Sequence, residues 1–409
     1  MSRAAFLAAP QRATPLAGHF TARDPASGAT TRSFHGTSSG AEHFLSIEAS
    51  PDRTFEDQVR EVCERYHRAL LGLELPAESA IFRRIFLSDT INQVATVRQS
   101  PLVEDQTAGP VAVSIVQQPP VSGAKIALLA YHVTGPQPIL KRCLSPRHTL
   151  VEKSGIRHLW STGLCAAAED GAPTESGTQT EMVFNDLIRA LESQGGTLRD
   201  HCVRTWLYLK DVDVFYRDMV HRRTDLFAAQ GLTADTHYIA STGIQGACAH
   251  RLDLVAMDAY SVLDVRPDQI AYLNDFEHLC ATNDYNVTFE RATRVAFADR
   301  SQYFISGTAS IDSLGHVVHP GDVEKQLAVA LGNVEALLRA DSANLDDMMY
   351  LIVYLRDPAD GRWIRAHLQE RLPKVPVIAV HGAVCRPEWL VEIEGVGIGA
   401  RAMPDLPAF

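Results

Sequence analysis

One order of strand-like and helix-like segments recurs along this chain of 409 residues, and it limits the possible folds more than any other feature. Three strand-like segments share an ending: RTWLYLKD at 204–211, YLIVYLRD at 350–357 and IFLSD at 85–89. Their aromatic and β-branched residues favour buried strands. Each follows a stretch with apolar residues at helical spacing, as at 323, 327, 331, 334 and 338. The recurrence indicates that one supersecondary unit is repeated along the chain.

We therefore predict an α+β protein of three repeated units, each about 100 residues long. The helices should lie outside and the sheets should pack around a common axis, which makes one chain an internal pseudo-trimer. The expected organisation is a flexible tail over 1–18, a degenerate unit over 19–150, a second unit over 151–262, a linker over 263–280 and a third unit over 281–403 that carries the active site. A chain that closes this arrangement by itself is expected to be a monomer or at most a weak dimer.

Composition argues against several classes of partner. The net charge of −11 provides no basic field for nucleic acid or an anionic membrane. No apolar run reaches the roughly 18 residues that a membrane-spanning helix needs. The seven cysteines are scattered and include no C-x-x-C pair, which favours free thiols in a reducing compartment. We expect a cytoplasmic protein with neither a nucleic-acid nor a membrane partner.

No metal and no organic cofactor is expected. The histidine pairs in HGTSSGAEH (35–43) and GHVVHPGD (315–322) lie in loops that offer no third ligand. The glycine-rich GVGIGA at 395–400 ends a strand and no helix follows it, unlike a phosphate-binding loop.

The stretch VCRPEWLVEIEG at 384–395 is the strongest candidate for chemistry. In a strand, its alternation places Glu392 and Glu394 on one face. That face is either exposed to water or part of a cleft in which one carboxyl acts as an acid. Arg204 lies on an apolar strand, where a charge normally needs a partner, and Asp200 or Asp211 is the expected one.

The second and third units resemble the Rid (YjgF-like) proteins, small trimeric α+β proteins of the chorismate-mutase-like fold, in SGTASI, HPGDVEKQLAVALGNVEALLRA and VEIEGVGI. Roughly residues 200–400 are more closely similar to the chorismatases, which hydrolyse chorismate on a Rid-like scaffold. That resemblance is carried, in one order along the chain, by RTWLYL, NVTFERATRV, YFISGTASI with GHVVHPGDV, YLIVYLRDPAD and VCRPEWLVEIEG.

The resemblance implies an enzyme of secondary metabolism that hydrolyses the enol ether of chorismate, or of a related unsaturated carboxylic acid, and releases pyruvate without a cofactor. Its partner would be a small anionic substrate. Glu392 would be the catalytic acid, because a buried carboxyl with a raised pKa can protonate the terminal CH₂ carbon. Glu394 would be a structural or supporting group. The implied substrate-binding residues are Cys385, Tyr285, Arg291, Arg204, Tyr354, Ala309, Gly307 and Arg386.

Two other functions remain open at this point. One is a Rid-type enamine or imine hydrolase or a related biosynthetic enzyme, and the other is a ligand-binding scaffold without catalysis. The arginine that binds the substrate carboxylate in Rid deaminases falls near Val377, which disfavours ordinary deamination. Tyr285 and Leu207 stand where the chorismatase pattern has an arginine and an asparagine. The arginines left as candidates for binding substrate carboxylate are Arg204, Arg291, Arg294 and Arg386.

Overall fold

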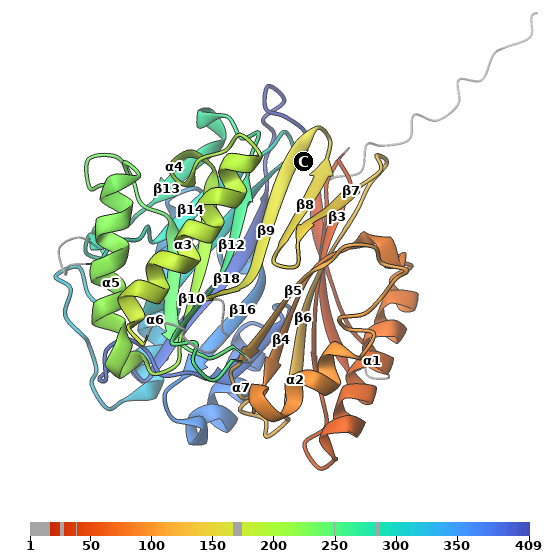
Figure 1. Cartoon of the computed structure of the whole chain (residues 1–409), viewed down its shortest axis with the longest axis horizontal. Coiled ribbons are helices and arrows are strands. Elements are labelled where there is room, and N and C mark those ends of the chain that lie inside the picture. Colours follow the sequence, from red (N-terminus) through yellow and green to blue (C-terminus); the bar gives the residue numbers. More distant parts are fainter. Residues whose placement is uncertain (1–16, 25–27, 38, 167–173, 249, 283–286) are drawn as a thin grey trace, which may run out of the picture.

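The computed structural model describes residues 17–24, 28–37, 39–166, 174–248, 250–282 and 287–409, which form three six-stranded sheets (Figure 1). The first sheet contains β1 (Gly18–Asp24), β2 (Ala29–His35), β3 (Ala41–Glu48), β4 (Ala80–Leu87), β5 (Ala112–Gln117) and β6 (Ile126–Thr134). The second contains β7 (Leu140–Ser145), β8 (His148–Lys153), β9 (Ile156–Cys165), β10 (Cys202–Leu209), β11 (Ala240–Gln245) and β12 (Val255–Val262). The third contains β13 (Ile270–Leu273), β14 (Ala292–Ala296), β15 (Arg300–Ala309), β16 (Met348–Leu355), β17 (Val377–His381) and β18 (Val391–Ala400).

All three sheets have the same strand order. The first is β1-β2-β3-β6-β4-β5, and the other two repeat it as β7-β8-β9-β12-β10-β11 and β13-β14-β15-β18-β16-β17. In each sheet the last strand lies in the middle, and the fourth and fifth strands are parallel. This identity of topology confirms the prediction of three α+β units.

Helices cover the outer face of each sheet. The first unit has α1 (Phe55–Gly72) and α2 (Thr90–Arg98), the second α3 (Ser176–Ser193), α4 (Leu198–His201) and α5 (Val212–Ala229), and the third α6 (Val323–Arg339) and α7 (Gly361–Arg371). Figure 1 shows α1 outside the red and orange strands and α3 and α5 on the opposite side of the molecule. Short 3₁₀ helices connect the other elements at η1 (Ala77–Ser79), η2 (Pro267–Gln269), η4 (Leu345–Asp347) and η5 (Pro358–Asp360).

The units begin earlier in the chain than the sequence suggested. β7 belongs to the second sheet although it precedes residue 151, and β13 belongs to the third sheet although it lies within the expected linker 263–280. The expected tail over 1–18 falls almost entirely outside the described residues.

The aspartate that ends each repeated strand motif has one local role in all units. The side chains of Asp89 and Asp211 cap α2 and α5, where they accept hydrogen bonds from backbone N–H groups of the first helical turn. Asp357 caps η5, which leads into α7, in the same way. A side-chain acceptor at this position satisfies a backbone N–H that has no partner inside the helix. The motif therefore indicates a strand that ends directly at the N-cap of the next helix.

One backbone hydrogen bond recurs at each of the three contacts between units. The N–H of Gln117, which ends β5, donates to the carbonyl of Ala247 at 2.7 Å. The N–H of Gln245, which ends β11, donates to the carbonyl of Ala383 at 3.1 Å. The N–H of His381, which ends β17, donates to the carbonyl of Pro119 at 2.8 Å. These bonds run from unit one to two, two to three and three to one, which closes a ring as threefold symmetry would.

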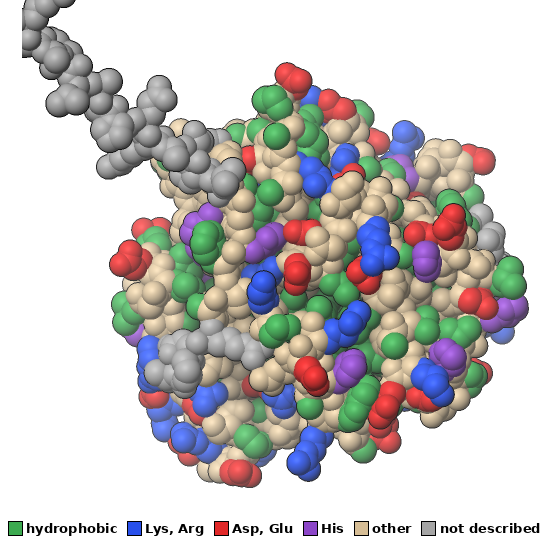
Figure 2. Space-filling model, turned by 180° about the vertical axis from the view of Figure 1, so that it is seen from behind, with side chains coloured by type: hydrophobic (Ala, Val, Ile, Leu, Met, Phe, Trp, Pro, Cys, Tyr) green, Lys and Arg blue, Asp and Glu red, His purple; other side chains and the backbone are tan. Residues whose placement is uncertain are grey.

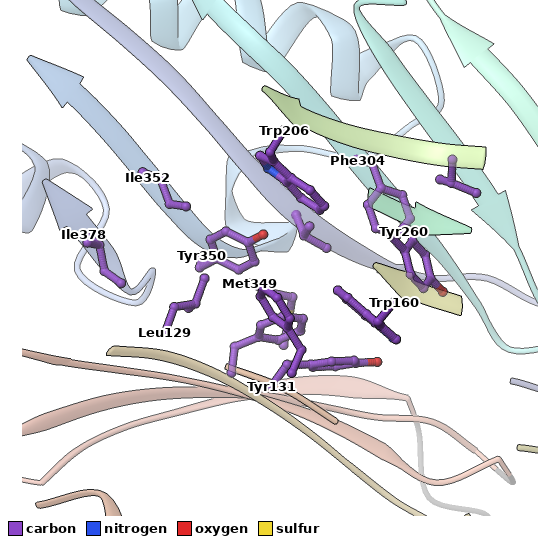
Figure 3. Close-up of a cluster of buried hydrophobic side chains, with 14 of the residues drawn as sticks. Leu129, Tyr131, Trp160, Trp206, Tyr260, Phe304, Met349, Tyr350, Ile352 and Ile378 are labelled. Atoms are coloured by element: carbon purple, nitrogen blue, oxygen red, sulfur yellow. The ribbon is translucent and has the colours of Figure 1, made fainter. Parts of the chain in front are cut away.

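The inner faces of the three sheets meet in a single aromatic core. Tyr131, Trp160 and Tyr350 come from the three different units, and each is at most 8% exposed. Figure 3 shows them converging, with Trp206 and Phe304, on the space between the sheets. Three further apolar clusters lie between each sheet and its own helices. Each unit is thus packed on both faces, and the interfaces between units are as buried as a domain interior.

The outer surface carries charges of both signs. Figure 2 shows acidic, basic and apolar side chains interspersed over one face of the molecule. Within the described part of the chain, no helix combines the length and apolar character that crossing a membrane requires.

Candidate active site

The pocket that contains Glu392 lies between the second and third units and encloses about 450 Å³, its open mouth included. α5 and β11 of the second unit form one side, and β15, β18 and the 384–390 loop of the third unit form the other. Its lining residues are Tyr216, Arg223, Ser241, Thr242, Gly243, Phe289, Arg291, Gly307, Ala309, Ile311, Cys385, Trp389 and Glu392.

The side chain of Glu392 lies against an irregular part of β15. The register between β15 and β18 shifts between Ile305 and Thr308, and Gly307 lies in this irregular part. A Cβ atom on Gly307 would collide with the Oε1 atom of Glu392, so a glycine there leaves the room that the carboxyl occupies. The side chain of Glu392 is buried, with 5% of the residue exposed. The pocket therefore has a carboxyl in its wall that bulk water hardly reaches.

The environment of Glu392 favours its protonated form. Burial raises its pKa to about 8, and the nearby charge of Glu394 acts in the same direction. The positive charges of Arg204 and Arg291 oppose this shift only in part. A carboxylic acid that keeps its proton at neutral pH can serve as a proton donor.

Glu394 lies on the same face of β18 but is saturated with hydrogen bonds. Its carboxylate accepts bonds from the Nη2 atom of Arg204 at 2.7 Å, from Trp206 Nε1 at 2.9 Å and from the Tyr354 hydroxyl at 3.0 Å. The Thr242 hydroxyl donates a further hydrogen bond. A charge this deeply buried is stable only with such partners. The two glutamates, two residues apart, thus have opposite environments.

The first unit contributes to this network through Arg84. Its Nη1 atom lies 3.6 Å from Glu394 Oε1, and its Nη2 atom lies 3.2 Å from Asp258 Oδ2 in the second unit. Asp258 also accepts hydrogen bonds from the hydroxyls of Ser114 at 2.6 Å and Tyr208 at 3.0 Å. Two guanidinium groups and two carboxylates from all three units therefore pair with one another behind the pocket.

The predicted site residues separate into those that line the pocket and those that support it. Gly307, Ala309, Cys385, Arg291 and Glu392 all line it. Burial raises the pKa of Cys385 to about 12, with the nearby Glu392 as a further cause, so its thiol keeps its proton and forms part of the wall.

Arg204, Tyr354 and Arg386 are not among the residues that line the pocket. Arg204 and Tyr354 both bond to Glu394 behind it. The guanidinium of Arg386 lies over the ring of Trp389, 4.7 Å from the centroid, and donates to the Gly315 carbonyl at 3.1 Å. The predicted residue Tyr285 lies outside the described residues.

The prediction that Asp200 or Asp211 pairs with Arg204 was wrong. Its carboxylate partner is Glu394, which lies 190 residues further along the chain in a different unit. Asp211 instead caps α5, and Asp200 bonds to Thr197 in a local turn. Arg294, another candidate, lies 3.5 Å from Asp341 and is also absent from the pocket lining.

Arg223 is the main lining residue that sequence reasoning missed. It lies on α5 and is 2% exposed, on the same helix face as the buried Met219, Val220 and Phe227. The sequence signal was that Arg223 lies four residues after the apolar Met219 and four before the apolar Phe227, on a helix face that is expected to be buried. Trp389, also missed, donates from Nε1 to the carbonyl of Ser310 at 2.9 Å and closes one wall of the pocket.

The lining of the pocket therefore combines a carboxyl whose pKa is raised to about 8, the arginines Arg223 and Arg291, and apolar walls that include Phe289 and Trp389. Guanidinium groups bind carboxylates in a planar, bidentate fashion, and aromatic walls suit a flat ring. The arrangement suits a small ring-bearing anion whose reaction begins with proton transfer.

Comparisons with known proteins agree with this description. The family model described as Endoribonuclease L-PSP matches residues 290–398. A chorismatase of Streptomyces rapamycinicus is 31% identical over 213 residues, which cover 47% of this chain and 63% of the relative. The match therefore spans less than two thirds of that relative's length. A 3-hydroxybenzoate synthase of Streptomyces hygroscopicus is 28% identical over 268 residues, covering 60% of this chain and 77% of the relative.

A chorismatase of Streptomyces hygroscopicus is 28% identical over 252 residues, covering 57% of this chain and 70% of the relative. The crystal structure of a chorismatase superposes with a TM-score of 0.59 at 19% identity, covering 78% of this chain and 93% of that structure, which shows that the fold is shared. Together these matches show that the chain is similar in sequence to chorismatases, shares their fold, and contains in its third unit a region that matches the Endoribonuclease L-PSP family model.

Proposed function

We propose that this protein is a chorismatase-like enzyme of secondary metabolism that cleaves the enol ether of chorismate, or of a closely related acid, and releases pyruvate. One observation carries the proposal: Glu392, with its pKa raised to about 8, lines a pocket that Arg223 and Arg291 also line. The relatives named chorismatase and 3-hydroxybenzoate synthase support the choice of substrate class.

The proposed reaction begins with the proton of Glu392. The carboxyl transfers it to the terminal CH₂ carbon of the enol ether, and the C=C electron pair forms the new C–H bond. The positive charge that results lies on the adjacent carbon and the ether oxygen, and a water molecule adds to that carbon. The hemiketal then breaks its bond to the ring oxygen, which takes up the proton of the hemiketal hydroxyl, so that pyruvate and a ring alcohol are formed. The proton lost by the water returns to Glu392, so the acid is restored in each cycle.

Arg223 and Arg291 are proposed to bind the carboxylates of the substrate. They reach the pocket from opposite units, Arg223 from α5 and Arg291 from the segment before β14. A substrate held between them would be oriented across the unit interface, with its enol ether close to Glu392. Such positioning accounts for a large part of the rate acceleration in many enzymes.

The direct test is incubation of the full chain with chorismate, with pyruvate measured through NADH oxidation by lactate dehydrogenase. Glu392→Gln should lower kcat by about 10²- to 10⁴-fold, because the amide cannot protonate carbon. Glu388→Gln is the matched control, since Glu388 is four residues away and exposed, and it should retain full activity. No pyruvate from the wild type, or full turnover by Glu392→Gln, would contradict the proposal.

Pyruvate release does not distinguish between the possible ring products, so the ring product is identified separately. Mass spectrometry separates a hydroxylated cyclohexadiene acid, the product of simple hydrolysis, from a hydroxybenzoate, which contains one water fewer. The names of the relatives include both kinds of enzyme. Ala309 lines the pocket beside Glu392 and leaves room for the ring, so replacing it with a larger residue should change the product ratio or the KM.

A further inference from the structure

A second pocket lies between the first and second units, at the place equivalent to the active site. It is a wide cleft of about 1,540 Å³, including its open part. β5 and α2 of the first unit form one side, and β9 with the loop before β12 of the second unit forms the other. The equivalent elements of the next interface, β11 with α5 and β15 with the loop before β18, form the proposed active site.

The internal symmetry makes this correspondence specific. The backbone bond from Gln117 to Ala247 at this interface is the counterpart of the bond from Gln245 to Ala383 at the next. Gly163 on β9 lines this pocket as Gly307 on β15 lines the active site, and the two follow similar strand sequences, LWSTG and YFISG.

A hydroxyl at equivalent positions also donates to a buried carboxylate in both places. Ser114 on β5 donates to Asp258, and Thr242 on β11 donates to Glu394. The second pocket is therefore a copy of the first rather than an unrelated surface hollow.

The second pocket has no carboxyl at the position that corresponds to Glu392, and one of its walls is apolar. Tyr208 of β10 is paired with Ala256, whereas Tyr354 of β16 is paired with Glu392. An alanine therefore occupies the place of the catalytic carboxyl. On the other side, Val113 and Ile115 of β5 replace the small residues Ser241 and Gly243 of β11. This pocket can bind an apolar ring but cannot carry out the same proton transfer.

A buried carboxyl in the wall of this pocket has a thiol, a weak hydrogen-bond donor, beside it. Asp253 is 2% exposed, and among the described residues no N–H or O–H group donates to either of its carboxylate oxygens. The ring of His250 is 3.9 Å from Oδ1, beyond hydrogen-bond distance. Burial raises the pKa of Asp253, and a hydrogen bond from the Cys165 thiol opposes this shift. A thiol is a weak donor, so a ligand that supplies an O–H group to this carboxyl would be bound more tightly there.

Positive charge lies close to that carboxyl. The guanidinium of Arg147 is next to Cys165, with Nη2 at 3.2 Å from the sulfur and Nη1 donating to the Cys165 carbonyl at 2.7 Å. Arg98 of α2 also lines the pocket, on the side of the first unit. Besides Asp253, the other acidic side chain in the lining is that of Glu104, and His250 is the remaining titratable base among the described lining residues.

We propose that this pocket is a second, non-catalytic binding site for a small hydroxylated ring carboxylate. The ring would lie against Val113 and Ile115, the hydroxyl would donate to Asp253, and the carboxylate would pair with Arg147 and Arg98. The ring product of the proposed reaction is such a molecule, and this choice of ligand rests on the proposed function. The existence of the site rests on the geometry of the pocket.

The test is isothermal titration calorimetry of the full chain with 3-hydroxybenzoate. Ala309→Phe fills the proposed active-site pocket, so one binding site per chain should remain in that variant, against two in the wild type. In the Ala309→Phe background, Arg147→Gln should weaken the remaining site at least tenfold. Arg142→Gln is the matched control, because Arg142 is exposed and bonds to Gln194 outside the pocket, and it should leave binding unchanged.

Asp253→Leu separates a ligand site from a structural role. Removing a buried carboxyl whose donor is a weak thiol should leave the melting temperature unchanged or raise it while it abolishes binding to the second site, whereas loss of a structural contact would lower the melting temperature. The proposal is overturned if Ala309→Phe binds no 3-hydroxybenzoate, or if Arg147→Gln and Asp253→Leu bind it as tightly as their parent. Arg147→Gln alone should turn over chorismate at the wild-type rate. If the wild type releases no pyruvate but Ala309→Phe still binds, the proposed function fails and the second site stands.

Discussion

Glu392→Gln is expected to make the protein more stable while it removes activity. Burial raises the pKa of Glu392 to about 8 from its ordinary value of 4.5. Between these two pH values the carboxyl is protonated in the folded protein and ionised in the unfolded chain. Each pH unit above 4.5 therefore lowers the free energy of unfolding by about 1.4 kcal/mol. At pH 7 this amounts to about 3 kcal/mol, and glutamine removes it because an amide does not ionise.

The sign and the pH window of this effect follow from the raised pKa. The stabilising contribution of the protonated carboxyl is fully present below pH 4.5 and is lost as the pH rises toward about 8. The variant and the wild type should therefore have equal stability near pH 4.5, and their difference should grow until about pH 8. For 409 residues the entropy of unfolding is about 0.9 kcal/mol/K, so 3 kcal/mol corresponds to roughly 3–4 °C in melting temperature.

Glu394→Gln is the matched control because it lies on the same strand face, two residues away. It breaks the buried pair with Arg204, whose Nη2 is 2.7 Å from the carboxylate, and leaves that guanidinium buried. Loss of one partner of such a pair costs about 3–5 kcal/mol, or roughly 3–6 °C on the same scale. The two variants should therefore shift the melting temperature in opposite directions.

Differential scanning calorimetry at pH 5, 7 and 9 measures both shifts, with near-ultraviolet circular dichroism to check the folded state. A Glu392→Gln variant that melts below the wild type at pH 7, or a difference that does not change between pH 5 and 8, would refute the assignment of a raised pKa. Similar shifts from both variants would refute the distinction between the two glutamates.

Four further outcomes are expected. The kcat/KM for chorismate should be constant below about pH 8 and fall tenfold per pH unit above it, because the acid works protonated and burial raises the pKa of Glu392 to about 8; a flat profile to pH 10 would exclude Glu392 as the acid. Arg84→Met should lower the free energy of unfolding by about 3–5 kcal/mol and shift that pH profile, because Arg84 of the first unit pairs with Glu394 and Asp258. A variant with the melting temperature and pH profile of the wild type would show that the first unit does not act on the site through Arg84. Gly307→Ala should lower kcat with little change in overall fold, because the new Cβ displaces Glu392, and unchanged kcat would contradict the close packing. Light scattering should give the mass of one chain of 44.9 kDa, or of a weak dimer, and a stable trimer of chains would contradict internal closure.

Much of the fold was predictable because the interactions that specify it are local. The strand endings IFLSD, RTWLYLKD and YLIVYLRD combine a buried strand with an aspartate that caps the next helix, and both preferences act within a few residues. The placement of β7 and β13 was not predictable to the same degree. Both are short edge strands with few buried apolar residues, so they give a weak periodic signal.

The candidate site was predicted in part. Gly307, Ala309, Cys385 and Glu392 come from two segments of one unit, and the sequence motifs that contain them are continuous. Arg223 was missed because it reaches the pocket from another unit, on a helix whose other buried residues are apolar. The pairing of Arg204 with Glu394 was missed for the same reason, since nothing in the chain near either residue identifies its partner.

The sequence by itself determined the repeated unit, the strand that carries two glutamates on one face, and the glycine and small residues opposite it. These features depend on backbone periodicity and local hydrogen bonding, which neighbouring residues decide. Only the tertiary structure decided how the surroundings of the two glutamates differ. Glu394 faces Arg204 and Arg84 from the two other units and is paired, whereas Glu392 lies two residues away in a pocket where burial outweighs the nearby positive charge. The cost of burying a charge depends on what surrounds it in space, and those surroundings exist only once the three units have closed around their common axis.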